Sequence, residues 1–215
     1  MDKYKNKIIE FKKRPNKRNK KNHALNMIKI IGGKYKRSNL VVPTNNVRPT
    51  SAIKREAVFS IIESYAYKNS IDLYHNKAVL DIFAGSGSIG LEAISRGIKE
   101  AYFYENNPEV VKILKQNCFK ICKNNKYVII EDDVMIFPPK KSLLPLSLIY
   151  IDPPYHQYDI LELLLQLIKK NIIEKNTIII VETHIDDNFK VIEKLKVFEQ
   201  KSYGKTLIYF IKLLT

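Results

Sequence analysis

The 215-residue sequence has no tryptophan, only two cysteines, and no apolar run long enough to cross a membrane. Its longest apolar run, residues 160–168, is interrupted by Glu162 and is far shorter than the about 20 residues a membrane helix needs. The first 27 residues contain no apolar core of a secretory signal. Cys118 and Cys122 have no second Cys or His pair beside them, which indicates core packing rather than a zinc site. We therefore expect a cytoplasmic protein without membrane attachment and without a metal.

Acidic residues are few relative to basic ones, since 22 Asp and Glu stand against 37 Lys and Arg, for a formal net charge of +15. Residues 1–26 are rich in Lys and Asn and lack apolar periodicity, which predicts a disordered basic arm. Residues 27–215 are also basic, and this excess indicates a polyanionic partner such as RNA or DNA. The alternative is a compositional bias toward lysine and asparagine that has no partner behind it.

The chain is organised around residues 78–97, where a buried strand, a glycine-rich turn and a helix starting near Ser88 follow one another. Gly85 and Gly87 lack side chains, so backbone N–H groups can approach a ligand closely and φ can become positive. The start of the helix presents free N–H groups and the positive end of the helix dipole, which favours an anion. Asp81 adds a negative charge beside the turn. A ligand with both a carboxylate and an ammonium group, such as S-adenosylmethionine (SAM), suits this neighbourhood.

The same glycines also satisfy a second ligand pattern. Residues 85–90, GSGSIG, match the dinucleotide fingerprint G-x-G-x-x-G, and Glu105 lies at a suitable distance downstream to hold a ribose. This stretch alone therefore does not separate SAM from NAD, and an NAD-dependent oxidoreductase stays open. A tightly packed strand-to-helix turn without a ligand is a further alternative.

Strand and helix patterns alternate along the rest of the chain. Strands are expected at residues 79–83, 101–105, 127–131, 147–152 and 177–182, and helices at 107–123 and 159–170. Two final strands, 196–203 and 206–213, form an expected hairpin around Gly204 and an antiparallel edge. The alternation predicts an α/β fold with a mostly parallel sheet covered by helices on both faces.

A small β unit is expected at residues 27–50, with short strands at 27–31 and 38–42 on either side of a Gly32-Gly33 turn. Basic side chains cluster next to this turn and favour contact with phosphates, although a solvated hairpin face is the alternative. The residues expected to contact nucleic acid are Lys34, Lys36, Arg37, Arg48 and Thr50.

A helix follows this unit, with Thr50 or Ser51 as its cap. Its expected apolar stripe consists of Ile53, Ala57, Ile61 and Tyr65, with Val58 and Ile62 beside it. The domain organisation that follows is a basic arm (1–26), a small hairpin and helix subdomain (27–70) and a main domain (71–215).

Acidic residues fall at the carboxyl ends of four predicted strands: Asp81, Glu105, Asp133 and Asp152. Ligands of parallel α/β sheets bind beyond these ends, so four acids in succession predict a shared crevice. SAM has a use for three of them. Asp81 would hold the methionine ammonium, Glu105 both ribose hydroxyls and Asp133 the adenine amine.

Asp152-Pro153-Pro154-Tyr155 is the sharper motif. Two prolines remove two N–H donors, so the turn presents carbonyl groups and one carboxylate. Such a surface suits a planar amino group of a nucleobase. Acceptance of both N–H bonds by Asp152 and the Pro153 carbonyl would favour a pyramidal nitrogen and aim its lone pair at a sulfonium methyl. Tyr155 is placed to stack on the base. This pattern leaves guanine and adenine equally open, and a non-catalytic RNA-binding module with a degenerate pocket is a further alternative.

Five segments together, residues 30–33, 48–50, 81–97, 152–155 and 203–206, resemble the bacterial 16S rRNA guanine-N2 methyltransferase family, RsmD. The resemblance covers the chain from Met27 onward and implies a Rossmann-like, SAM-dependent fold with a seven-stranded sheet. It implies methylation of a guanine N2 in 16S rRNA of an assembled or partly assembled 30S subunit, with residues 152–155 holding the target base. We expect a monomer. An adenine-N6 methyltransferase of DNA or RNA is the alternative.

The resemblance also implies a set of cofactor residues. By this resemblance, the residues expected to bind SAM are Asp81, Phe83, Ala84, Gly85, Gly87, Glu105, Asn106, Asp133 and Val134.

Overall fold

The computed structural model describes residues 26–43, 51–141, 144–154, 157–187 and 189–214. The predicted basic arm, apart from Asn26, lies outside these residues. So do three predicted contact residues, Arg48, Thr50 and Tyr155.

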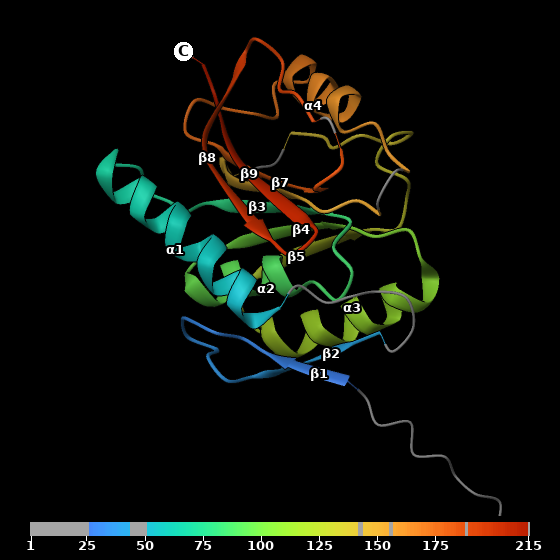
Figure 1. Ribbon diagram of the computed structural model, residues 1–215. Coiled ribbons are helices and arrows are strands. Elements are labelled where there is room, and N and C mark those ends of the chain that lie inside the picture. The colour runs from blue at the N-terminus through green and yellow to red at the C-terminus, as the bar shows by residue number, and fades with distance from the viewer. Residues whose placement is uncertain (1–25, 44–50, 142–143, 155–156, 188, 215) are drawn as a thin grey trace, which may run out of the picture.

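A seven-stranded sheet forms the centre of the molecule (Figure 1). In chain order its strands are β3 (Ala78–Ile82), β4 (Glu100–Tyr104), β5 (Lys126–Ile130), β6 (Leu146–Ile151), β7 (Ile178–His184), β8 (Leu195–Tyr203) and β9 (Thr206–Leu213). Their spatial order is β5-β4-β3-β6-β7-β9-β8; the first five run parallel, and β9 is antiparallel to both β7 and β8. The predicted mostly parallel α/β fold with an antiparallel hairpin around Gly204 is confirmed. The strand order reverses between β3 and β6, which is where a ligand crevice opens in such sheets.

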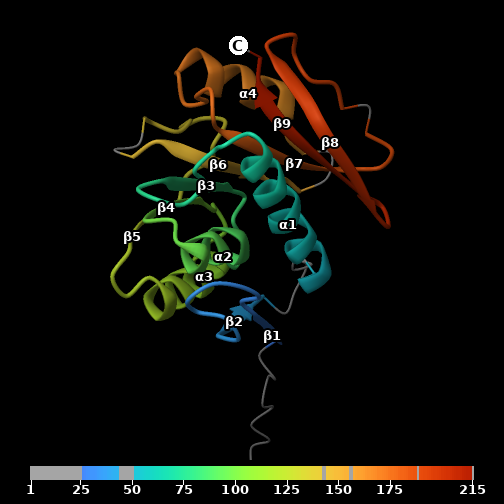
Figure 2. The same ribbon diagram turned by 90° about the vertical axis from the view of Figure 1, so that its left-hand side faces the viewer.

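Helices cover both faces of the sheet, as Figures 1 and 2 show. One face packs against α1 (Ala52–Lys68), α2 (Ser88–Arg96) and α3 (Pro108–Ile121), and the other against α4 (Ile160–Lys169). The strands β3, β6 and β7 are almost continuously buried because both of their faces are covered. Cys118 and Cys122 are buried thiols in the α3 side of the core, as their spacing predicted.

The segment between β5 and β6 departs from the alternating pattern. The described part of residues 131–145 forms turns rather than a helix. A cavity of about 510 Å³ lies beside β4 and β5, with Leu80, Tyr102 and Val128 among its lining residues.

Polar residues set where three of the helices begin. Side-chain oxygens of Ser51 for α1, Asn107 for α3 and Asp159 for α4 accept backbone N–H groups of the first turn. Of the two caps expected for the first helix, Ser51 is therefore the one observed. Helix α2 instead begins at Gly87, which offers no capping side chain.

The predicted apolar stripe of α1 is confirmed only in part: Val58 and Ile62 are buried, and Ile61 and Tyr65 pack against the core. Ile53 is 75% exposed, and the buried side chains of the helix are Arg55, Val58, Phe59, Ile62 and Ala66. Apolar residues occur on every side of this helix, so periodicity does not define its inner face. Contacts with neighbouring elements select that face instead. One of them joins α1 to the N-terminal strand β1 (Asn26–Lys29): the buried side chain of Arg55 donates from Nη2 to Lys29 O at 2.8 Å.

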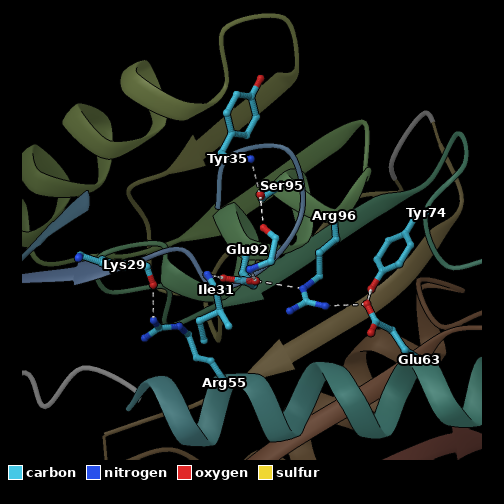
Figure 3. Close-up of polar contacts among 10 residues, drawn as sticks. Lys29, Ile31, Tyr35, Arg55, Glu63, Tyr74, Glu92, Ser95 and Arg96 are labelled. Atoms are coloured by element: carbon cyan, nitrogen blue, oxygen red, sulfur yellow. Dashed lines mark hydrogen bonds and ion pairs between the residues drawn. The ribbon is translucent and has the colours of Figure 1, made fainter. Parts of the chain in front are cut away.

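The N-terminal strands β1 (Asn26–Lys29) and β2 (Asn39–Val42) form the predicted antiparallel hairpin. It lies on the far side of α2 and α3 from the sheet (Figures 1 and 2). Figure 3 shows how it is attached: the fully buried carboxylate of Glu92 on α2 accepts the backbone N–H groups of Ile31 and Gly32 at 2.8 and 2.7 Å. Arg96 donates to the same carboxylate at 3.0 Å and reaches Glu63 of α1 at 2.8 Å.

Close packing explains why glycine stands at position 33. A Cβ atom there would lie 1.9 Å from the backbone oxygen of Ser95, and the φ of Gly33 is +73°. Lys34 donates its backbone N–H to the same oxygen at 2.7 Å. The paired glycines were predicted as a turn, and the structure adds that they let the hairpin touch the backbone of α2.

Candidate active site

The two motifs singled out in the sequence meet at one edge of the sheet. β3 and β6 are neighbours, with Ile82 paired to Ile151. The next residue after β6, Asp152, donates its backbone N–H to Ile82 O at 3.4 Å. The double-proline corner therefore begins beside the glycine turn that follows β3.

The glycine turn has the backbone shape that the sequence predicted. Gly85 and Gly87 have φ values of +55° and +76°. A Cβ atom on Gly87 would lie 2.5 Å from Leu114 Cδ1, so a larger residue would have to displace that side chain in addition to adopting a strained backbone conformation. Gly87 supplies no side-chain cap, so the first N–H groups of α2 are available to an anion, except that of Gly90, which donates to Asp81.

Asp81 lies inside β3, beneath this turn, rather than at its mouth. Its side chain is 2% exposed, and Oδ2 accepts the backbone N–H of Gly90 in α2 at 2.9 Å. Burial raises the pKa of Asp81 to about 8; the Gly90 bond opposes that rise, whereas the carboxylates of Asp152 and Glu105 add to it. Asp81 therefore fixes the start of α2 and places a titratable group under the crevice.

Glu105 follows β4 directly and reaches the glycine turn. Its Oε2 accepts the backbone N–H of Gly85 at 2.9 Å, and its Oε1 accepts that of Asn107 at the same distance. The preceding strand and the turn are joined as well, since Ala84 N donates to Tyr104 O at 2.8 Å. Asn106 is exposed beside this contact. Glu105, Ala84 and Gly85 are thus brought together, as expected for one binding surface.

Asp133 lies three residues after β5 and stabilises a turn. Its Oδ1 accepts the backbone N–H of Met135 at 2.8 Å, while Val134 is buried. Their role toward the adenine of a cofactor stays a prediction.

Phe83 connects the glycine turn with a cavity. It has a φ of +61°, a value that a bulky residue adopts only when its surroundings impose it. Its ring lies 4.5 Å from that of Tyr158, centroid to centroid. Tyr158 in turn lines a cavity of about 410 Å³, whose wall also contains Pro153, Pro154 and Glu182.

A buried polar cluster beside Asp152 was missed by the sequence interpretation. Glu182, in the second half of β7, is 1% exposed. One of its carboxylate oxygens binds Lys54 Nζ of α1, and the other accepts from the hydroxyl of Tyr150. Burial and then the Glu182 carboxylate raise the pKa of Asp152 to about 7, and Lys54 opposes this rise. An acid ending a long apolar run was a usable signal for Glu182. Nothing in the helical pattern marked Lys54.

The hairpin residues predicted to contact phosphates lie away from the crevice at the glycine turn. Lys34, Lys36 and Arg37 are exposed, and Lys34 is bonded at the C-terminal end of α2, the end opposite the glycine turn. The structure therefore does not bring these three residues to the crevice. Their contact with RNA stays a prediction.

Two further findings concern only the part of the chain that the structure describes. No helix there is both long enough and apolar enough to span a bilayer. No group of three or more His, Cys, Asp or Glu side chains there is arranged to hold a metal ion.

Comparison with known proteins gives consistent matches over nearly the whole chain. The family model described as Conserved hypothetical protein 95 matches residues 28–212. Ribosomal RNA small subunit methyltransferase D of Buchnera aphidicola subsp. Baizongia pistaciae is 32% identical over 76% of this chain and 79% of that protein. The protein of the same name from Escherichia coli K12 is 29% identical over 80% of this chain and 83% of that protein. The solved structure of the putative methyltransferase yhhF from Escherichia coli superposes with a TM-score of 0.74 at 25% identity, covering 87% of this chain and 98% of that one.

Proposed function

Because this chain belongs to the family described as Conserved hypothetical protein 95, the RsmD family, we propose that it is a SAM-dependent rRNA methyltransferase that modifies the N2 amine of a guanine in 16S rRNA. Membership makes the chain a methyltransferase, rather than the NAD-dependent oxidoreductase that the glycine turn alone allowed. The observation that carries the finer proposal is the contact between Asp152 and Ile82. This contact brings Asp152 and the two prolines that follow it, which offer only hydrogen-bond acceptors, next to the glycine turn, which can bind an anion.

The residues around the glycine turn fit SAM. Its methionine carboxylate matches the remaining N–H groups at the start of α2, and its positive charges match the carboxyl groups of Glu105 and Asp152 nearby. Glu105 retains lone pairs for ribose hydroxyls after its two backbone bonds. SAM would supply a methyl group carried on a sulfonium. The residues of the chain must hold and orient the target amine and accept its proton.

Asp152 and the Pro153 carbonyl are assigned to the target amine. An exocyclic amine is a poor nucleophile because its lone pair is delocalised into the ring. Acceptance of both N–H bonds favours a pyramidal nitrogen, and holding it against the methyl donor supplies the orientation that the transfer needs. The nitrogen becomes acidic once it has gained the methyl group, and Asp152, with a pKa near 7, can then take the departing proton.

The RNA must present an unstacked base to this corner. Enzymes that act on a base take it out of the stack or use one that is already unpaired. The aromatic pair of Phe83 and Tyr158 beside the cavity offers surfaces for such a base, and Tyr155 is assigned the same role on sequence grounds. Lys34, Lys36 and Arg37 are assigned to phosphates at the flank of the molecule. We place the target in the small subunit, assembled or partly assembled.

A nucleoside analysis tests this proposal directly. Purified chain is incubated with 30S subunits from a strain lacking the gene, together with methyl-labelled SAM, and the digested rRNA is analysed by mass spectrometry. The expected product is N2-methylguanosine at one position of 16S rRNA. Label in N6-methyladenosine would instead identify the adenine alternative, and absence of label from rRNA would overturn the proposal. Calorimetry with SAM and with NAD checks the cofactor, with binding expected for SAM alone.

A further inference from the structure

Asn117 is a buried polar residue on the inner face of α3, and it is only 1% exposed. All other buried side chains of this helix are hydrophobic: Val110, Val111, Leu114, Cys118 and Ile121. An asparagine rarely occupies such a position unless hydrogen bonds satisfy its amide. The partners of this amide therefore indicate the role of the residue.

The amide of Asn117 joins backbone groups of two segments that are distant in the sequence. Its Oδ1 accepts the backbone N–H of Val41 in β2 at 2.9 Å, and its Nδ2 donates to Val41 O at 2.8 Å. Nδ2 also donates to Ser86 O, in the middle of the glycine turn, at 2.9 Å. The two N–H groups of the amide are thus both used, one by the hairpin and one by the turn.

The peptide unit between Ser86 and Gly87 is held at both of its polar atoms. Asn117 binds its oxygen, and its N–H group donates to Ala84 O at 2.8 Å. Glycine adopts positive and negative φ about equally readily, so the φ of +76° at Gly87 is not imposed by the residue itself. The two hydrogen bonds fix the orientation of this unit, and Asn117 supplies one of them.

This peptide unit lies directly before the part of the site that is assigned to SAM. Helix α2 begins at Ser88, the next residue, so the direction of its first N–H groups depends on how the turn is held. A site that is fixed in its binding conformation before the ligand arrives loses less conformational entropy on binding. Loss of the bond from Asn117 would therefore weaken the binding of a methionine carboxylate at this turn.

The N-terminal hairpin completes this support. Val41 occupies the other side of the Asn117 amide, and β1 and β2 lie beside α2 and α3 (Figures 1 and 2). We propose that Asn117 is a positioning residue for the methyl donor, and that the hairpin is a necessary part of the SAM site because Val41 orients this amide toward Ser86. The inference rests on the proposed function, because it concerns the same cofactor.

Calorimetry with SAM, in the absence of RNA, tests the role of Asn117. In Asn117→Asp the side chain keeps an acceptor for the Val41 N–H, but it sets a carboxylate against the carbonyl groups of Val41 and Ser86. We expect the Kd for SAM to rise at least about tenfold, because a buried hydrogen bond is replaced by repulsion. The matched control is Asn125→Asp, because Asn125 Nδ2 also donates to two backbone carbonyls, beyond the C-terminal end of α2. Its Kd for SAM should stay within twofold of that of the unmodified chain.

Urea denaturation of both variants separates positioning from stability. A purely structural role of Asn117 would lower the free energy of unfolding and leave the Kd of the folded protein unchanged. A folded Asn117→Asp protein whose Kd for SAM changes less than threefold would therefore overturn the inference. Failure of the unmodified chain to bind SAM would instead refute the proposed cofactor, so the two failures are distinguishable.

Val41→Pro tests the contribution of the hairpin, and it provides the decision if Asn117→Asp does not fold. Proline removes the N–H that donates to Asn117 Oδ1, and an edge strand such as β2 tolerates it. We expect the Kd for SAM to rise at least about threefold. Lys120→Met is the control, because Lys120 Nζ also joins α3 to β2, through Asn39 O at 2.8 Å, and its Kd should not change. An unchanged Kd in folded Val41→Pro would contradict the role given to the hairpin.

Discussion

The pH dependence of methyl transfer is the prediction that the structure defines most closely. Asp152 must be ionised to accept its N–H bond from the amine and later the departing proton, and burial together with Glu182 raises its pKa to about 7. Raising the pH from 6 to 8 therefore increases the ionised fraction of Asp152 from about one-tenth to about nine-tenths. We expect kcat/KM to rise about tenfold over this interval and then to level off.

The same reasoning predicts how a variant shifts this profile. Lys54 is the cation that opposes the rise in the Asp152 pKa, so Lys54→Met should move the midpoint to higher pH. Lys126→Met is the control, because Lys126 pairs with Glu100 at the far end of the sheet. Initial rates measured with limiting SAM report the pKa values of groups in the free enzyme, and Asp152 is such a group. A flat profile between pH 6 and 8, or an unchanged midpoint in folded Lys54→Met, would refute the reasoning.

Three other outcomes are expected. Asp152→Ala should abolish methyl transfer while SAM binding persists in calorimetry; activity within a few-fold of the unmodified chain would remove Asp152 from the chemistry. Glu92→Ala should lower the free energy of unfolding by about 3–5 kcal/mol, measured by urea denaturation, since two partly buried backbone N–H groups lose their acceptor and Arg96 loses one of its two carboxylate partners. A loss below about 1 kcal/mol would contradict the attachment described for the hairpin. Removal of residues 1–25 should leave the unfolding transition unchanged and weaken RNA binding chiefly at low salt, whereas loss of folding would disprove the arm assignment.

The sheet was predictable because its signals are local. Each strand is a short apolar run ended by a polar residue or a glycine, and the hairpin around Gly204 combines two such runs with a turn residue. The proximity of the glycine turn to the double-proline corner followed from a general property of parallel sheets, whose strand ends share one edge. Neither prediction needed knowledge of how distant segments pack.

What the sequence left undetermined depends on contacts between distant segments. Lys54 and Glu182 are separated by 128 positions and come from elements with different periodicities. The inner face of α1 was predicted only in part for the same reason, since its buried residues include Arg55, which a hydrophobic pattern excludes. Asp81 was expected to hold the methionine ammonium, and that role stays a prediction; its bond to Gly90 only becomes evident when α2 is placed over β3.

Helix α2 has consequences beyond holding the glycine turn. It has nine residues and is therefore about 13 Å long. Its first turn follows the glycine turn, and its second half holds the N-terminal hairpin through Glu92 and Ser95. The hairpin and the glycine turn are therefore attached to the two ends of one short, rigid element, so a displacement of either end would be carried to the other.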